Sequence, residues 1–267
     1  MSIDRLQTSL LMTPDQYADQ WAINSQSYNA EGYYHWMSDQ LGSIKTVVEI
    51  GCGCGNGTLA LVQNGRRVVV IEPNAKAIEL TANNLTGAGL SVLVSQERAS
   101  IDSMEQQGTN VVIVQGDIFD SKLNQLLGGL NFDAIACWLI GAEPERIAEH
   151  IGKSLEAFVA PDTAVYRERL HRRCFELGRL CLKIDGCVQM VDRQGIGSWS
   201  EKDYAREHFA GLYSRLAGDD YLIEKTDVML KRMHSAMQTS QIKYFAQDGD
   251  PRAVRVFGSA KARLLRR

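Results

Sequence analysis

The sequence lacks the features that define several classes of protein. It has no apolar run approaching the roughly 18 residues of a membrane-spanning helix, since its longest apolar stretches are the size of strands. It has little net charge, because 29 Lys and Arg stand against 32 Asp and Glu, so no global field would attract nucleic acid or an anionic membrane. With 45% hydrophobic and 23% charged residues, its composition argues against a disordered or collagen-like chain.

A secretory signal is also missing ahead of the cysteines, and this bears on their redox state. The six cysteines lie inside apolar or glycine-rich runs, which is typical of reduced thiols in the cytosol. We therefore expect a cytoplasmic protein without disulfides. The cysteines are Cys52, Cys54, Cys137, Cys174, Cys181 and Cys187.

The 267 residues suffice for one large α/β domain or two small ones. From residue 46 onward, short β-branched runs alternate with helical patterns, which predicts βα units and a mostly parallel sheet buried on both faces. The expected strands are 46–50, 67–72, 111–115 and 132–139, with helices near 58–64 and 75–86.

The segment before this pattern is polar and rich in aromatic residues. Thr13-Pro14-Asp15-Gln16 is a capping-box start for a helix over about 14–26, with Tyr17 and Trp21 on one face. We leave the following aromatic stretch unassigned. The sequence thus divides into an N-terminal segment, 1–44, as a lid or substrate region, and a Rossmann-like domain, 45–267.

The second half of the chain predicts further helices and strands. Apolar residues at helical spacing indicate one helix over 147–158 and another over 166–181. Ser198-Trp199-Ser200-Glu201 resembles a capping box that starts a third helix. A turn over 183–186 would precede a strand at 187–192, and the end of the chain offers strands at 221–230, 241–246 and 253–258.

The strongest motif is a glycine loop between the first strand and a helix. Its glycines at 51, 53, 55 and 57 permit positive φ and let a ligand touch the main chain, which favours a nucleotide-like ligand. The spacing argues against a dinucleotide, because the sixth position counted from Gly51 or from Gly53 is not glycine. A phosphate-binding loop would need a terminal Lys-Ser/Thr, and residues 46–75 contain no lysine.

Three acidic residues lie at or just after the ends of the expected strands near this loop. Glu49 precedes the first glycine, where a carboxylate suits an ammonium group better than a diphosphate. Glu72 ends the second strand about 20 residues on, a position from which it can accept hydrogen bonds from both ribose hydroxyls. Asp117 follows the third strand, where it could accept from an adenine amino group while Ile118 packs on the ring.

These motifs, taken in order, resemble the class I S-adenosylmethionine-dependent methyltransferases over about residues 45–195. The resemblance implies a doubly wound, seven-stranded sheet whose last strand is antiparallel, with S-adenosylmethionine as the cofactor. Residues 182–186 (LKIDG) depart from the family's L-K-P-G-G turn. The expected cofactor-binding residues are Glu49, Gly51, Cys52, Gly53, Gly55, Glu72, Pro73, Asp117, Ile118 and Trp138.

The acceptor is less well indicated. Tyr28, Tyr33, Tyr34 and Trp36 could form an aromatic lid that binds the acceptor, although packing on the sheet edge explains them too. We expect no metal, assign no catalytic residue, and single out only His35 as a base to test. Residues 137–144 (CWLIGAEP) lack the Asp/Asn-Pro-Pro-aromatic tetrad of methyltransferases that act on nucleic-acid amino groups.

The sequence therefore predicts a methyltransferase that acts on a small molecule, without membrane or nucleic-acid binding and with an undetermined oligomeric state. Three alternatives stay open: an RNA or protein methyltransferase, a non-catalytic S-adenosylmethionine-binding protein and, more remotely, a nicotinamide dehydrogenase. The arginines of 166–181 fit a solvated helix face better than an anion-binding site.

Overall fold

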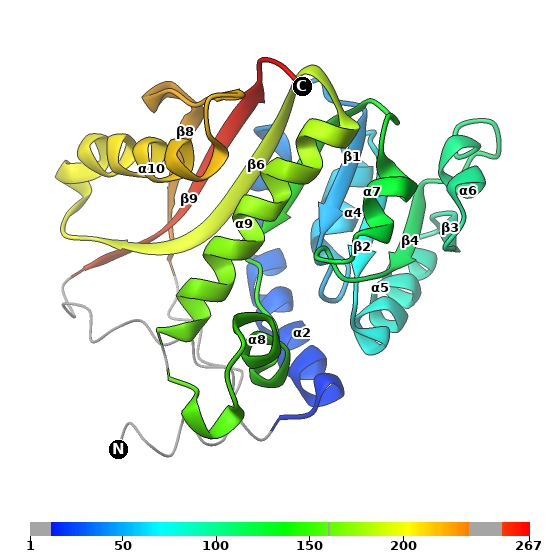
Figure 1. Cartoon of the computed structure of the whole chain (residues 1–267), viewed down its shortest axis with the longest axis horizontal. Coiled ribbons are helices and arrows are strands. Elements are labelled where there is room, and N and C mark those ends of the chain that lie inside the picture. The colour runs from blue at the N-terminus through cyan, green and yellow to red at the C-terminus, as the bar shows by residue number, and fades with distance from the viewer. Residues whose placement is uncertain (1–11, 160, 235–252) are drawn as a thin grey trace.

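A single mixed sheet forms the centre of the molecule (Figure 1). The computed structural model describes residues 12–159, 161–234 and 253–267, and this part of the chain holds nine strands. They are β1 (Thr46–Ile50), β2 (Arg67–Glu72), β3 (Val92–Val94), β4 (Val111–Gln115), β5 (Phe132–Trp138), β6 (Leu182–Ile196), β7 (Tyr221–Leu222), β8 (Val228–Arg232) and β9 (Val254–Leu264).

The strand order is β3-β4-β2-β1-β5-β6-β9-β7, with β8 also paired to β9. Neighbours from β3 to β6 are parallel, whereas β9 runs antiparallel to β6, β7 and β8. This confirms the predicted Rossmann-like, doubly wound α/β fold with an antiparallel last strand. The strand count exceeds the expected seven because the short strands β3 and β7 are added to the sheet.

Helices connect the strands and cover the sheet. The predicted capping box at Thr13 is present: its Oγ1 accepts from the Gln16 amide at 3.3 Å, and Gln16 Oε1 accepts from the Thr13 amide at 3.0 Å. The α-helices are α2 (Pro14–Ala30), α3 (Tyr33–Asp39), α4 (Asn56–Gln63), α5 (Ala75–Gly87), α6 (Arg98–Asp102), α7 (Lys122–Leu127), α8 (Pro144–Ile151), α9 (Asp162–Cys181) and α10 (Lys202–Ala217).

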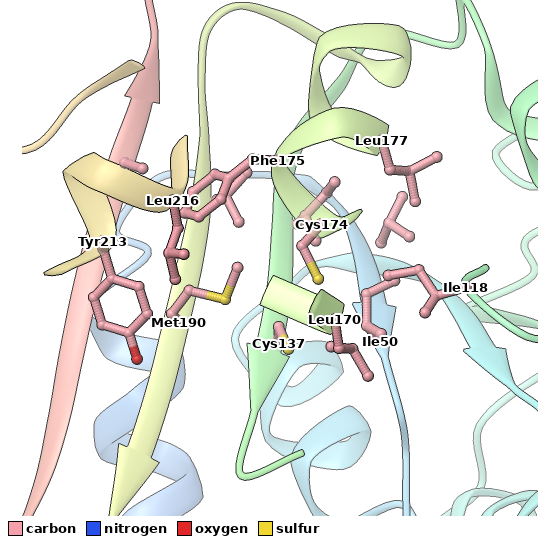
Figure 2. Packing of buried hydrophobic residues seen from close by; sticks show 14 of the residues in the cluster. Ile50, Ile118, Cys137, Leu170, Cys174, Phe175, Leu177, Met190, Tyr213 and Leu216 are labelled. Carbon is pink, nitrogen blue, oxygen red and sulfur yellow. The ribbon is translucent and has the colours of Figure 1, made fainter. Parts of the chain in front are cut away.

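The core has two layers, one on each face of the sheet. Residues of α2, α3, α4 and α5 pack on one face, and residues of α7, α8, α9 and α10 pack on the other. Figure 2 shows part of the second layer, where Leu170 and Cys174 of α9 lie near Cys137 of β5, and Tyr213 and Leu216 of α10 lie near Met190 of β6. The strands β1, β2, β4 and β5 are thereby buried on both sides over most of their length, whereas the edge strand β3 is exposed at Leu93 and Val94.

Two predicted helix boundaries are wrong. The helix expected over 147–158 ends at Ile151, because Gly152 adopts φ +74°, and the chain then forms a 3₁₀ turn at Leu155–Ala157. Ser198 makes no capping hydrogen bond to the backbone. Its hydroxyl pairs with that of Ser200, and a 3₁₀ turn at Trp199–Glu201 precedes α10.

Two strand predictions also need correction, and a third is not tested. The turn expected at 183–186 lies inside β6, where Asp185 has φ +63° and the register against β5 shifts. The strand expected at 221–230 is divided into β7 and β8 by a 3₁₀ turn at Lys225–Asp227. Residues 241–246 lie outside the described residues.

The arginines of α9 mainly hold neighbouring elements together, rather than forming a solvated face. Arg173 donates to the Ile118 carbonyl and to Asn124 of α7, and Arg179 pairs with Asp220 at 2.7 Å. Arg169 donates to the carbonyl of His150 at the end of α8.

No helix among the described residues combines the length and apolar character needed to cross a membrane.

Candidate functional site

The glycine loop lies at the carboxyl end of β1, as the sequence predicts. Gly51, Gly53 and Gly55 have φ of +76°, +57° and +84°, a region that L side chains rarely adopt. Gly57, at the start of α4, leaves room for Glu49, because a Cβ there would lie 2.8 Å from Glu49 Oε1. The glycines are therefore required by the backbone turn and by the close approach of a carboxylate.

Two side chains of α5, Thr81 and Asn84, form hydrogen bonds to the glycine loop. The Thr81 hydroxyl is within 3.2 Å of both the Cys52 sulfur and the Gly53 carbonyl oxygen, and Asn84 donates to the Cys54 carbonyl at 3.0 Å. Cys52 and Cys54 are buried, and burial raises the pKa of both thiols. They are structural thiols of the loop.

Glu49 is a buried carboxylate beneath the loop. It is 2% exposed, and its Oε2 accepts a 2.6 Å hydrogen bond from the Thr58 hydroxyl. Burial raises its pKa to about 8; the bond from Thr58 opposes this rise and the charge of Glu72 adds to it. A positive group placed nearby would restore the ionised form.

Glu72 ends β2 beside the loop and is also buried. Its Oε2 accepts from the Cys52 amide at 3.1 Å, and its Oε1 accepts from the Asn74 amide at 2.9 Å. Burial raises its pKa to about 7, although both backbone bonds lower it. Each oxygen keeps acceptor capacity toward the cavity, so the carboxylate is already oriented for a ligand.

Asp117 is engaged by protein groups on both of its oxygens. Oδ1 accepts from the Phe119 amide at 2.9 Å, and Oδ2 lies 2.7 Å from Arg146 Nη1 and 2.9 Å from His150 Nε2. Burial acts to raise its pKa, but the Phe119 amide and the two α8 side chains lower it overall. Asp117 therefore ties the end of β4 to α8.

These side chains surround a cavity of about 80 Å³ at the carboxyl ends of the parallel strands. Its charged lining comes from Glu72 at the end of β2, Asp117 after β4, and Glu143 and Arg146 at the start of α8. Trp138, the last residue of β5, also lines the cavity, and its indole donates to Gln189 Oε1 at 3.0 Å. Of the predicted cofactor-binding residues, Gly51, Gly53, Glu72, Pro73, Asp117, Ile118 and Trp138 line the cavity.

The other three predicted residues, Glu49, Cys52 and Gly55, lie behind this lining. Cys52 and Glu49 are buried, and Gly55 packs against Thr81 of α5, whose Cα would be 3.1 Å from an added Cβ. They shape the loop and its charge. Direct contact of these three residues with a ligand stays a prediction.

The protein's own side chains cover the glycine loop. An added Cβ would clash with Trp21 at Gly53 and with Ile140 at Gly51, and it would lie 2.7 Å from the Tyr17 hydroxyl at Gly141. Ile140 reaches the loop because Leu139 adopts φ +56° at the end of β5 and turns the chain. Helix α2 thus covers part of the cavity with two side chains one turn apart, Tyr17 and Trp21.

The predicted aromatic lid is not where the sequence placed it. Tyr28, Tyr33 and Tyr34 are at most 5% exposed and pack in the core layer of α2, α3 and α4, with Phe257 of β9 against the first two. Trp36 is partly buried against the same layer. Among the described residues, none of these four lines the cavity, so packing explains them; His35 is exposed.

Sequence reasoning missed several lining residues. Tyr17 and Trp21 share one helix face, which was visible in the sequence, but nothing there showed that this face meets the glycine loop. Glu143 and Arg146 also escaped notice, although Pro144 is a helix-start signal that would have placed both in the first turn of a helix. The further missed residues include Ile140, Gly141, Tyr166 and Leu170.

No protein-family model matches the chain, and no curated protein matches it. Solved structures do resemble it. N-methyltransferase NodS from Bradyrhizobium japonicum WM9 is 10% identical, with a TM-score of 0.45 over 90% of this chain and 96% of that one. A SAM-dependent methyltransferase from Methanosarcina mazei is 16% identical, with a TM-score of 0.46 over 86% and 96%.

A putative sarcosine dimethylglycine methyltransferase from Galdieria sulphuraria is 13% identical, with a TM-score of 0.47 over 90% of this chain and 84% of that one. Similarity at this level does not assign an activity. The described residues contain no group of three or more His, Cys, Asp or Glu placed to hold a metal ion. The assignment of function therefore rests on the geometry of the cavity and its charges.

Proposed function

We propose that this protein is an S-adenosylmethionine-dependent methyltransferase that acts on a small molecule. One observation carries the proposal: two buried carboxylates, Glu49 and Glu72, stand at the ends of adjacent strands beside a glycine loop. Burial makes their ionised forms costly, and a cationic ligand with an adenosine moiety would relieve that cost while using the ribose-binding position of Glu72.

The same two acids argue against a pyrophosphate ligand. A dinucleotide would bring negative charge to a loop that lies over Glu49, and this charge would keep the buried acid protonated instead of relieving the cost of its burial. A helix start that binds phosphate offers its backbone amides without a competing acid. A sulfonium and an ammonium group therefore suit this site better than a diphosphate.

Each part of the cofactor would have a partner in the cavity. Gly51 and Gly53 would contact the amino-acid arm, Glu72 the ribose, and Ile118 with Asp117 the adenine. The bound cofactor supplies a methyl group on a positively charged sulfur. The protein's part is to orient the two reactants and exclude water, for which the cover formed by Trp21 and Ile140 is suited.

The fit requires movement of this cover. Sites for ligands of this size usually span about 300–1,000 Å³, and with this cover in place the cavity is about 80 Å³. The N-terminal half of α2 is more exposed than its second half, where Ser25 and Asn24 are buried and Asn56 donates to Ser25 at 3.1 Å. We therefore propose that the segment 1–44 acts as a lid through Tyr17 and Trp21, on a Rossmann-like domain at 45–267 in a cytoplasmic protein.

Transfer of a radiolabelled methyl group tests the proposal. The purified protein is incubated with labelled S-adenosylmethionine and, separately, a small-molecule panel, bulk tRNA and a protein extract. We expect label in the small-molecule fraction. Label in RNA or protein would favour the alternative acceptors, and cofactor binding without transfer to any acceptor would favour a non-catalytic binding protein.

A further inference from the structure

Asn74 connects three parts of the site. It follows Pro73 after the end of β2, is 9% exposed, and lines the cavity together with Glu72. Its backbone amide donates to Glu72 Oε1 at 2.9 Å, which fixes its position next to this acid. Its side-chain amide forms further hydrogen bonds to α5 and to α2. One residue thus links the acid, the helix that follows it and the helix that covers the cavity.

The oxygen of the Asn74 side chain caps α5. Oδ1 accepts from the Lys76 amide at 2.9 Å and from the Ala77 amide at 3.3 Å. Because both of these backbone groups are donors, the oxygen of the side-chain amide must face them, and the nitrogen must face away from them. The cap therefore fixes the direction in which the Nδ2 donor points.

The nitrogen of the same amide holds the start of α2. Nδ2 donates to the carbonyl oxygen of Pro14, the first residue of α2, at 2.8 Å. Helices are capped about equally well by Asn, Asp and Ser, but of these three only Asn combines the capping oxygen with an N–H donor on the same group. The bond to α2, and not the cap alone, therefore explains an asparagine at this position.

The turn that Asn74 holds carries the cover of the cavity. Tyr17 and Trp21 follow Pro14 by about one and two turns on the same helix. Both line the cavity, and the Trp21 indole lies against Gly53, since a Cβ added to this glycine would clash with it. Movement of the first half of α2 would therefore uncover the glycine loop.

The two halves of α2 are held differently. In the second half, Ser25 is 2% exposed, its hydroxyl lies 2.9 Å from that of Tyr34, and Asn56 donates to it at 3.1 Å. In the first half, residues 14–16 are exposed and Tyr17 is half-buried. Segments that bury little surface open at a lower cost in free energy than the core does. A hydrogen bond at the exposed end of α2 should therefore change how often its first half opens.

We propose that Asn74 is a positioning residue: it is the latch that holds the first half of α2 over the cavity, and it thereby sets how fast a ligand enters. The latch is a property of the free protein, whereas its role in the entry of S-adenosylmethionine rests on the proposed function. Loss of the Nδ2 donor should leave the cap of α5 in place and let the cover open more often.

Hydrogen–deuterium exchange of the ligand-free protein tests the latch. Asn74→Ser and Asn74→Asp both keep an oxygen that can cap α5, and both lack the Nδ2 donor. Amides of residues 17–22 should therefore exchange about two- to tenfold faster in each variant, which is the range expected for the loss of one hydrogen bond. Exchange in α5 and over residues 33–39 should not change. Unchanged exchange over residues 17–22 in both variants would overturn the proposal.

Two further variants separate the latch from the cap. Asn74→Ala loses both, so it should speed exchange in the first turn of α5 as well as over residues 17–22. Asn110→Ser is the matched control: Asn110 Oδ1 accepts from the Ser91 amide at 2.9 Å just before β4, at the end of the sheet opposite to the cavity, and its loss should leave residues 17–22 unchanged. If only Asn74→Ala speeds exchange over residues 17–22, the cap of α5 holds the cover, and the proposal is wrong.

Stopped-flow binding of S-adenosylhomocysteine connects the latch with ligand entry. The association rate should be about two- to tenfold higher for Asn74→Ser than for the unmodified protein. An unchanged rate together with faster exchange over residues 17–22 would show that the ligand does not enter past this cover, and the role of the latch in entry would be wrong. If S-adenosylhomocysteine does not bind, the proposed function is wrong, and the exchange experiment still decides whether Asn74 holds α2.

Discussion

Glu49 and Glu72 are the residues on which the account depends most. Both are buried at strand ends, and burial raises their pKa values to about 8 and about 7. At pH 7 most of Glu49 and about half of Glu72 are therefore protonated in the ligand-free protein. The spacing of both acids could be predicted from the sequence, but their protonation could not, because it depends on how completely the folded chain excludes water.

Replacement of Glu72 tests its contact with the ribose. Glu72→Ala should weaken binding of S-adenosylmethionine by about 1–3 kcal/mol, because charge-assisted hydrogen bonds are lost. Calorimetry measures the dissociation constant, and thermal unfolding checks that the Cys52 and Asn74 contacts are not essential to the fold. Glu79→Ala, exposed on α5, serves as the control. An unchanged dissociation constant for Glu72→Ala would remove the ribose contact from this residue.

A cationic cofactor should also displace protons from the pair. The positive charge lowers the pKa of Glu49 and Glu72, so binding releases protons and the affinity increases as the pH rises from about 6 to about 8. Calorimetry in buffers of different ionisation enthalpy measures the number released. Proton uptake, or an affinity that falls over this range, would show that the ligand does not act on these carboxylates.

At the scale of the elements, the sequence predicts β1, β2 and β4 with the bounds that the structure has. Their β-branched runs are buried on both faces, so composition alone marks them. Sequence-based prediction fails where contacts in the folded chain set the end of an element. The helix expected to continue to residue 158 ends at Ile151, before Gly152, and β6 begins at Leu182, earlier than predicted, with Asp185 at a positive φ inside the strand. For the same reason the sequence predicts a lid from Tyr28 near the end of α2 and from the aromatic residues of α3, whereas the side chains that cover the cavity are Tyr17 and Trp21 of α2.

The position of α2 predicts how the cofactor reaches its site. Trp21 covers Gly53, so Trp21→Ala should speed association of S-adenosylmethionine, as measured by stopped flow. Trp36→Ala is a matched control, because Trp36 is also partly buried but does not line the cavity. An equal increase of the association rate in the two variants would mean that loss of packing in the N-terminal segment, and not removal of the Trp21 side chain from Gly53, speeds cofactor entry.

At the scale of the whole molecule, the buried acids link stability to pH. The folded protein holds protons on Glu49 and Glu72 that the unfolded chain, with an ordinary value of 4.5, releases. The free energy of unfolding should therefore fall as the pH rises above about 4.5, up to about pH 7 through Glu72 and up to about pH 8 through Glu49. Below this window the contribution is fully present.

Thermal unfolding between pH 5 and pH 8 checks this dependence. Glu49→Gln keeps the shape of the side chain without its titration, so its midpoint should fall less steeply over this range than that of the unmodified protein. The exposed Glu145→Gln should follow the unmodified protein. Parallel curves for the Glu49 variant and the unmodified protein would show that Glu49 does not titrate in this range.

The central claim is that the glycine loop and its two buried acids accept a positively charged adenosine derivative and not a pyrophosphate. Calorimetric titration of the protein with S-adenosylmethionine and, separately, with NAD tests it most directly. The account predicts saturable binding of S-adenosylmethionine with release of protons, and no measurable binding of NAD. Binding of NAD in preference to S-adenosylmethionine would contradict it.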